Sequence, residues 1–136
     1  MKAVKRVTCP YCGAPAILRE DTYVHGERGQ GKYLYVCKNF PKCDSYVGVH
    51  DGTQIPMGTL ANKELRKKRI SAHKFFNLLW KKHIMTKKQA YRWMECFMGL
   101  AKDDGHIAMF SDYRCNLLIE KCKEVLSNNN ITFPAA

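Results

Sequence analysis

Four cysteines near the N-terminus are spaced as ligands of a metal ion. Cys9 and Cys12 have two residues between them, Cys37 and Cys43 have five, and 24 residues separate the two pairs. Two thiolates on one tight turn can bind a tetrahedral ion, and a second turn supplies the other two ligands. Gly13 suits a backbone that must turn back sharply. Four sulfurs favour zinc over an iron centre, and with every position filled by protein the site is expected to be structural.

The charge of the chain is strongly positive and unevenly distributed. Lysine and arginine number 23 against 12 acidic residues, which gives a formal net charge of +11. Residues 63–92 carry 11 of these basic side chains and a single acid, Glu64. Clustering of this kind is typical of proteins that bind a polyanion, most often nucleic acid, although a lysine-rich helix face can also simply aid solubility.

The composition indicates a soluble protein of the cytoplasm. The first six residues, MKAVKR, lack the apolar core of a signal peptide. No apolar run approaches the length of about 18 residues that a membrane span needs. In a reducing compartment, seven cysteines favour metal binding and buried thiols over disulfides.

Residues 1–50 predict a zinc ribbon, a small sheet whose turns hold a metal ion. Short alternating runs predict strands at residues 16–19, 33–36 and 46–49. The glycine-rich segment 25–31 predicts a mobile hairpin tip, and residues 51–61 predict an irregular connector. Because so small a sheet buries little apolar surface, its folding is expected to depend on the ion.

Residues 62–127 predict three helices, followed by a frayed tail at 128–136. The expected N-terminal caps are Asn62, Thr86 (in a capping box with Gln89) and Ser111. The expected inner faces are Leu65, Ala72, Phe76, Leu79 and His83; then Ala90, Trp93, Met94, Phe97 and Ala101; then Cys115, Leu118, Ile119, Cys122, Val125 and Leu126. The fold class is therefore α+β, a ribbon followed by a three-helix segment.

The cysteine motifs resemble those of a known group of zinc ribbons. Cys9-Pro-x-Cys-Gly and Cys37-x-Asn-Phe-Pro-x-Cys43 are similar to the ribbons in the C-terminal regions of type IA DNA topoisomerases, where an aromatic-proline pair precedes the last ligand. This resemblance covers residues 7–49 and implies a ribbon that contacts single-stranded DNA.

A second resemblance spans nearly the whole chain. Its motifs are Cys43-Asp-x-Tyr-Val-Gly-Val-His50, Gly58-Thr-Leu-Ala61, Ala72-His-x-x-Phe76, Leu79-Trp80, Ala90-Tyr-x-Trp93 and His106-Ile-x-x-Phe110. They are similar to a zinc-finger-containing family common in bacteriophages and prophages. The resemblance implies a phage-encoded protein in the cytoplasm of the host and names no reaction. The asparagine-rich tail and the lysine-rich first helix lie outside that family's pattern.

The predicted ribbon also combines aromatic and basic side chains. Tyr35 and Phe40 are the rings expected to be exposed, and each could stack on an unpaired base with about 1–3 kcal/mol. The basic side chains that would follow the phosphates are Arg19, Lys32, Lys38 and Lys42. The alternative is that some of these rings cover the small sheet, because a ribbon has little else to pack.

The first predicted helix carries a basic stripe. Its members recur at helical spacing opposite the apolar face and are Lys63, Arg66, Lys67, Lys74 and Lys81. Lys68 and Arg69 are expected beside them. Such a face would contact phosphates without reading bases, which predicts loose sequence preference and steep salt dependence. Trp80 and Trp93 are expected in the core or between helices.

Three further cysteines lie in the helical segment, Cys96, Cys115 and Cys122. With His106 they could form a second metal site, but they lack the paired turns usual for zinc. Free cysteine is among the most buried residue types. Buried thiols in the helical core are therefore the preferred interpretation.

Catalytic motifs are missing from the sequence. It contains no complete phosphate-binding signature Gly-x-x-x-x-Gly-Lys-Ser/Thr, no Gly-x-Ser-x-Gly and no His-Glu-x-x-His. Asp103, Asp104 and His106 could hold a magnesium ion in a nuclease, but a polar break between helices explains them more simply. We therefore expect that the protein is not an enzyme.

The sequence predicts a protein that acts by binding. The favoured partner is nucleic acid, DNA rather than RNA, in single-stranded or distorted form. The alternative is an adaptor or inhibitor of a host polymerase or nuclease, using the same basic face on an acidic protein surface. One structural zinc ion is the expected cofactor, and neither a membrane nor a small-molecule substrate is expected.

Overall fold

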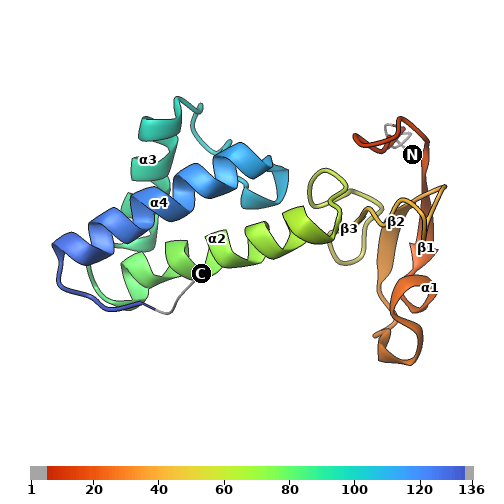
Figure 1. Cartoon of the computed structure of the whole chain (residues 1–136), viewed down its shortest axis with the longest axis horizontal. Coiled ribbons are helices and arrows are strands. Elements are labelled where there is room, and N and C mark those ends of the chain that lie inside the picture. The colour runs from red at the N-terminus through yellow and green to blue at the C-terminus, as the bar shows by residue number, and fades with distance from the viewer. Residues whose placement is uncertain (1–5, 134–136) are drawn as a thin grey trace. The chain divides into compact units, whose positions relative to one another are not determined.

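A computed structural model describes residues 6–133 of the chain (Figure 1). The chain divides between Glu64 and Leu65 into two compact units, which we call the ribbon unit and the helical unit. A small antiparallel sheet comes first and long helices follow, which confirms the α+β class. The predicted ribbon's residues 1–5 and the predicted tail's residues 134–136 lie outside the described residues.

The ribbon unit contains a three-stranded antiparallel sheet in the order β1-β2-β3. The strands are β1 (Ala16–Glu20), β2 (Tyr33–Cys37) and β3 (Tyr46–Gly48). Each predicted strand is confirmed to within one residue. In the register, Leu18 lies opposite Tyr35, which in turn lies opposite Val47. The central strand β2 is therefore hydrogen-bonded on both edges.

The predicted hairpin is confirmed, because β1 and β2 pair antiparallel, but the connection between them is helical. It contains the short helix α1 (Thr22–His25) and a 3-10 turn (Gly26–Arg28). Asp21 organises this connection, because its buried carboxylate accepts a hydrogen bond of 2.8 Å from the Gln30 N–H. The same hydrogen bond holds the pKa of Asp21 below its ordinary value. A single acid at the start of the segment thus overrides the glycine-rich composition.

The segment after β3 folds back along the sheet. Val49 forms a β-bridge with Pro56, and Tyr46 forms one with Ala61. Leu60 from this segment is fully buried. The core of the ribbon unit joins it to residues of the sheet and of the metal-binding turns, namely Cys9, Tyr35, Cys37, Val47 and Val49.

The helical unit is built from α2 (Lys63–Lys81, whose first two residues belong to the ribbon unit), α3 (Lys87–Met98) and α4 (Asp112–Asn128). A 3-10 turn (Ile107–Met109) precedes α4. The predicted capping box is confirmed, since the Thr86 hydroxyl accepts a hydrogen bond from the Gln89 N–H and the Gln89 side chain accepts one from the Thr86 N–H. Ser111 caps α4 through the Arg114 N–H.

The predicted inner faces form most of the helical core. Its fully buried side chains include Ala72, Phe76, Leu79, Ala90, Met94, Cys115, Leu118, Cys122 and Leu126. Two predicted members are wrong, because His83 and Ala101 lie beyond the ends of α2 and α3 and are exposed. Gly99 ends α3 in the left-handed conformation, with φ of 67°. Trp80 packs between helices as predicted, with its ring stacked on Tyr91 of α3 at 6.3 Å.

The beginning of the tail packs back on the helical unit. The Ile131 N–H donates to the Leu126 carbonyl, and the Phe133 ring meets the Phe75 ring edge-on at 5.5 Å. The frayed tail predicted from the asparagines is therefore wrong as far as Phe133. Within residues 6–133 no helix is both long and apolar enough to cross a membrane.

Candidate metal centre

The first metal-binding turn is a tight knuckle held by backbone hydrogen bonds. The Cys9 N–H donates to the Ala14 carbonyl at 2.8 Å, and the Gly13 N–H donates to the Cys9 carbonyl at 2.9 Å. Gly13 adopts φ of +75°, the left-handed conformation that favours glycine. The turn therefore directs the sulfurs of Cys9 and Cys12 toward the same point.

The second turn begins where β2 ends. Cys37 is the last residue of that strand, and its carbonyl accepts from the Phe40 N–H at 3.0 Å. The Cys43 N–H then donates to the Asn39 carbonyl at 3.0 Å. This wider turn, with five residues between its two cysteines, thus brings the sulfurs of Cys37 and Cys43 toward the same point.

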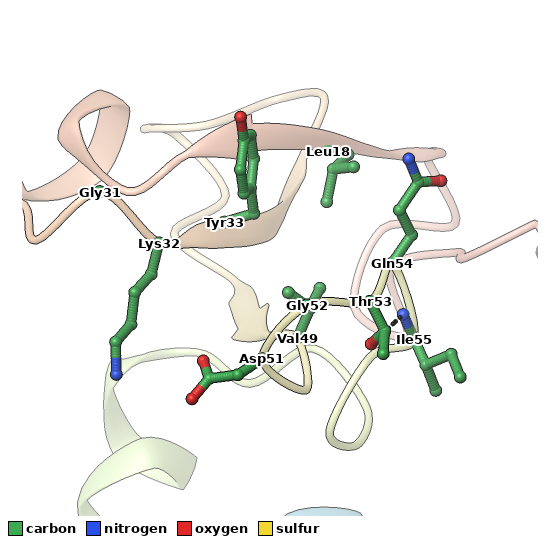
Figure 2. Close-up of a pocket in the computed structure, with 10 residues that line it drawn as sticks. All are labelled: Leu18, Gly31, Lys32, Tyr33, Val49, Asp51, Gly52, Thr53, Gln54 and Ile55. Atoms are coloured by element: carbon green, nitrogen blue, oxygen red, sulfur yellow. Dashed lines mark hydrogen bonds between the residues drawn. The ribbon is translucent and has the colours of Figure 1, made fainter.

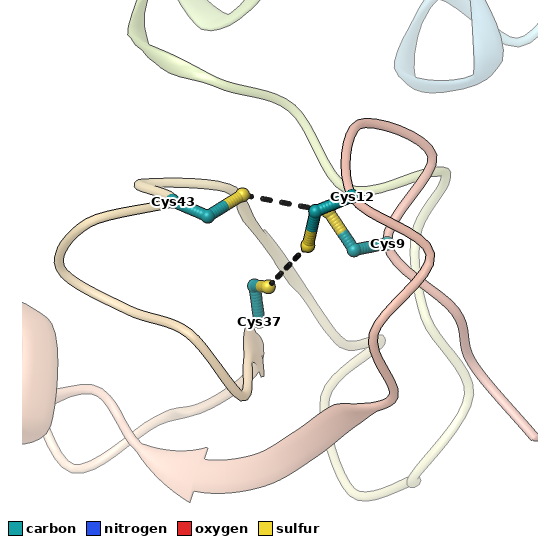
Figure 3. Close-up of side chains that lie close together, drawn as sticks. All are labelled: Cys9, Cys12, Cys37 and Cys43. Carbon is teal, nitrogen blue, oxygen red and sulfur yellow. Dashed lines mark hydrogen bonds between the residues drawn. The ribbon is translucent and has the colours of Figure 1, made fainter.

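The four sulfurs form a cluster of the size that zinc requires. All lie within 4.8 Å of one another. Cys9 Sγ is 3.6 Å from Cys43 Sγ, and Cys12 Sγ is 3.5 Å from Cys37 Sγ. Figure 3 shows the four side chains converging from the two turns. A zinc–sulfur bond of about 2.3 Å in a regular tetrahedron places the sulfurs about 3.8 Å apart. These separations therefore fit a zinc-binding site and are far too long for disulfides.

Two polar side chains surround the sulfurs. The buried hydroxyl of Ser45 lies 3.0 Å from Cys9 Sγ and 3.6 Å from Cys43 Sγ. The Asn39 amide donates to Cys12 Sγ at 3.6 Å. Hydrogen bonds of this kind orient metal ligands and spread their negative charge. Neither was predicted as a site residue: Asn39 stands in the second cysteine motif, whereas nothing in the motif marks Ser45.

The local environment prepares the first knuckle to ionise. Burial alone would raise the pKa of Cys9, but hydrogen bonds from Ser45 and from the Cys12 and Tyr11 backbone lower it to about 6. The Ala14 N–H lowers the pKa of Cys12. Desolvation raises the pKa of Cys37 to about 12. The thiols of the first knuckle therefore ionise more readily than that of Cys37, and all four cysteines would hold a zinc ion as thiolates.

Tyr35 does not occupy the predicted exposed position. It is only 7% exposed, and its hydroxyl donates to the Gln54 carbonyl at 2.7 Å. The prediction assumed that one face of β2 meets solvent, but the segment that folds back after β3 covers that face. The exposed tyrosine of the strand is Tyr33, at 48%.

Phe40 is half-buried and belongs to a small ladder of side chains. The centre of its ring lies 5.8 Å from the centre of the Tyr23 ring. The Arg19 guanidinium lies over the Tyr23 ring, 4.1 Å from its centre. Tyr23 is 48% exposed. We call Arg19, Tyr23 and Phe40 the aromatic ladder. Tyr23 was missed because no element was predicted for residues 20–24, where α1 begins.

The other predicted contact residues lie at the surface in two places. Lys38 and Lys42 are exposed in the second metal-binding turn, and Lys32 is exposed just before β2. Along α2, Lys63, Lys67, Lys74 and Lys81 are exposed and Arg66 is half-buried.

Two cations expected beside this stripe are engaged within the helical unit. Arg69 is buried and donates through Nε to the Phe110 carbonyl at 3.1 Å. Its expected place on the basic surface is therefore wrong. The Lys68 ammonium lies 3.3 Å from a carboxylate oxygen of Asp112.

The remaining cysteines behave mainly as packing groups. Cys115 and Cys122 are fully buried, as predicted, whereas Cys96 is exposed. Among the residues that the structure describes, the N-terminal cysteines are the one group of three or more metal-binding side chains close enough to share an ion. Asp103, Asp104 and His106 do not form such a group.

The comparisons with known proteins agree with this centre. No curated protein and no solved structure is significantly similar to the chain. A family described as a zinc-finger-containing domain, DUF3268, matches residues 5–125 and so covers both the cysteine cluster and the helices. The chain therefore belongs to this family of zinc-finger-containing domains.

Proposed function

We propose that this protein binds single-stranded or distorted DNA without catalysing a reaction on it. The observation that carries the proposal is the basic stripe on α2. Positions 63, 67, 74 and 81 fall within one narrow sector of an α-helix, and their lysines are exposed. The buried face, which includes Ala72, Phe76 and Leu79, lies on the opposite side. A row of cations on a rigid helix suits a phosphate backbone.

The ribbon unit adds groups that suit unpaired bases. The aromatic ladder offers the half-exposed ring of Tyr23 next to the Arg19 guanidinium. Lys38 and Lys42 are exposed in the turn that also carries Phe40. Rings flanked by cations favour stacking with backbone contact, which is the usual chemistry of single-strand binding.

The arrangement of the metal centre supports a binding role. Four cysteine sulfurs would fill the tetrahedral coordination of a zinc ion, which would leave no position for a water or a substrate. Its contribution in this proposal is to hold the ribbon unit together. We further propose a phage or prophage origin and action in the host cytoplasm. This proposal rests on the motifs that the chain shares with the zinc-finger-containing family of bacteriophages and prophages.

Fluorescence anisotropy with labelled single- and double-stranded oligonucleotides at two salt concentrations tests the proposal. We expect single strands to bind more tightly and binding to weaken steeply with salt. Replacing Lys67, Lys74 and Lys81 with glutamine should reduce the slope of log K against log salt by about 2, at about 0.7 per lost phosphate contact.

A matched variant separates the stripe from net charge. Lys102, Arg114 and Lys121 are exposed cations of the helical unit outside the stripe, and their replacement by glutamine removes the same charge. In this control variant the slope of log K against log salt should stay close to that of the wild-type chain. Equal losses in the two triple variants, or no binding of any oligonucleotide at low salt, would contradict the proposal.

One observation favours a second candidate, an adaptor or inhibitor that binds a host polymerase or nuclease. Ile70 is 58% exposed and, by helical geometry, lies among the lysines of the stripe. An apolar side chain contributes little to phosphate binding but suits a protein surface with acidic groups around it. A host protein captured from nuclease-treated lysate, and lost with Ile70→Ser, would favour this function.

A further inference from the structure

The ribbon unit contains a cavity that the proposed DNA contacts do not use. It has a volume of about 790 Å³ and lies between the start of β2 and the loop 51–55 (Figure 2). A smaller cavity of about 410 Å³ shares Lys32, Tyr33 and Asp51 with it. Volumes of about 300–1,000 Å³ are typical of small-ligand sites, so the space can hold a nucleotide.

The wall of the cavity that the loop 51–55 forms is preformed. The Thr53 hydroxyl donates to the His50 carbonyl at 2.7 Å and accepts from the Ile55 N–H at 3.1 Å. The Gln54 carbonyl accepts the hydrogen bond from the buried Tyr35. The loop is thus fixed to the central strand, and a ligand would not have to order it.

Three side chains on the lining suit a nucleotide. The Tyr33 ring is half-exposed and can stack on a base. The Lys32 ammonium can pair with a phosphate. Asp51 is exposed at the rim, and in the view of Figure 2 its carboxylate and the Lys32 ammonium extend toward each other.

The carboxylate decides which part of a nucleotide can lie beside it. Asp51 repels phosphate, so the group that faces it must donate hydrogen bonds. A carboxylate accepts two parallel N–H bonds especially well. Among the standard bases only guanine presents a ring N–H next to an exocyclic amino group on its Watson–Crick edge.

We propose that this cavity binds one unpaired guanine of the DNA strand. The base stacks on Tyr33 and donates its two N–H groups to Asp51, while Lys32 takes a neighbouring phosphate. The inference rests on the proposed function, and it adds a base preference that the phosphate-contacting stripe on α2 cannot supply.

The test uses the zinc-loaded full-length chain and three labelled 12-mers of thymidine in which one central position is dT, dG or dI. Inosine lacks only the exocyclic amino group of guanine. We expect the dG oligonucleotide to bind at least about fivefold more tightly than the dI oligonucleotide, as one bidentate contact would predict. Asp51→Asn should abolish this difference, because an amide offers a single acceptor oxygen.

Each matched control removes the same kind of group, an acid or an aromatic ring, at a position outside the cavity. Glu27→Gln removes an exposed acid of the ribbon unit that does not line either cavity, and it should preserve the preference for guanine. Tyr33→Ala should weaken all three oligonucleotides at least about fivefold, whereas Tyr113→Ala, in the helical unit, should not.

The outcomes separate this inference from the function on which it rests. If all three oligonucleotides bind equally to the wild-type chain, the guanine site is refuted and DNA binding stands. A preference that persists in Asp51→Asn also refutes it. If none of them binds at low salt, the proposed function fails and the guanine site fails with it.

Discussion

The ribbon unit and the helical unit are stabilised in different ways. In the ribbon unit the strands have five, five and three residues, and cysteines that bind the metal are themselves part of the core. In the helical unit the core consists of large apolar side chains such as Phe76, Phe110 and Leu118, which are fully buried. Phe76 lies on α2, and Leu118 lies on α4, which Ser111 caps.

This difference indicates that the two units respond to different perturbations. A small sheet cannot bury enough apolar surface to offset its loss of chain entropy, so metal-binding energy becomes folding energy there. The helical unit obtains its stability from packing and should respond to cavities in its core. Predictions that affect one unit and spare the other test the comparison directly.

Removing zinc is expected to have the largest effect. Chelation should unfold the ribbon unit, because the ion contributes on the order of 10 kcal/mol to such sites. Hydrogen exchange on the full chain should then show loss of protection at Val36 and Cys37 of β2, while Leu118 and Ile119 of α4 stay protected. Loss of protection in both units together would contradict the idea of separate stabilisation.

A cavity in the helical core should produce the reverse pattern. Phe76 is fully buried, and its ring meets the rings of Trp80 and Tyr91 at 5.1 and 5.0 Å. Phe76→Ala should therefore lower the free energy of unfolding of the helical unit by about 3–5 kcal/mol. Ile70→Ala, at an exposed position of the same helix, is the control and should change it by less than about 0.5 kcal/mol. Zinc affinity, measured by competition with a chelating dye, should not change in either variant.

The features predictable from sequence were those set by local chemistry. The spacing of Cys9, Cys12, Cys37 and Cys43 identified the metal site, because ligand geometry restricts the turns that carry them. Thr86 and Ser111 identified the starts of α3 and α4, because a side-chain cap acts within one helical turn.

The errors arose where distant segments decide the outcome. Tyr35 alternates with its neighbours like a surface residue, yet residues that follow β3 cover it. Arg69 is positively charged like the residues of the basic stripe, but it is buried and donates a hydrogen bond to the carbonyl of Phe110, 41 residues further along the chain. Ser45 contacts Cys9 across 36 residues, and no local pattern marks it. Such partners become visible only once the chain is folded.

Ser45→Ala should sharpen the comparison within the ribbon unit. With zinc bound, the Ser45 hydroxyl donates to the Cys9 thiolate, so its loss leaves that charge less stabilised. We expect zinc affinity to fall about 10- to 100-fold, as for other residues that support metal ligands. Thr22→Ala, which removes an exposed hydroxyl of the same unit outside the metal site, should leave the affinity unchanged. A variant with wild-type affinity would show that the hydroxyl has no role at the metal.

The smallest effect concerns pH and the helical unit. Desolvation raises the pKa of Cys115 to about 11 and that of Cys122 to about 12, from an ordinary value of 9.0. Since the folded-state pKa values are raised, the stability that these thiols contribute is complete below pH 9 and is lost as the pH rises through the folded-state values.

At pH 10 the loss should be about 1 kcal/mol for each thiol, because one pKa unit corresponds to about 1.4 kcal/mol. Denaturant unfolding at pH 8 and pH 10 measures it. Replacing both cysteines with alanine lowers stability at both pH values but should remove this part of the pH dependence. All other ionisable groups are the same in both proteins, so the difference between the wild-type and variant slopes isolates the thiols. Equal slopes would mean that Cys115 and Cys122 ionise as easily in the folded core as in water.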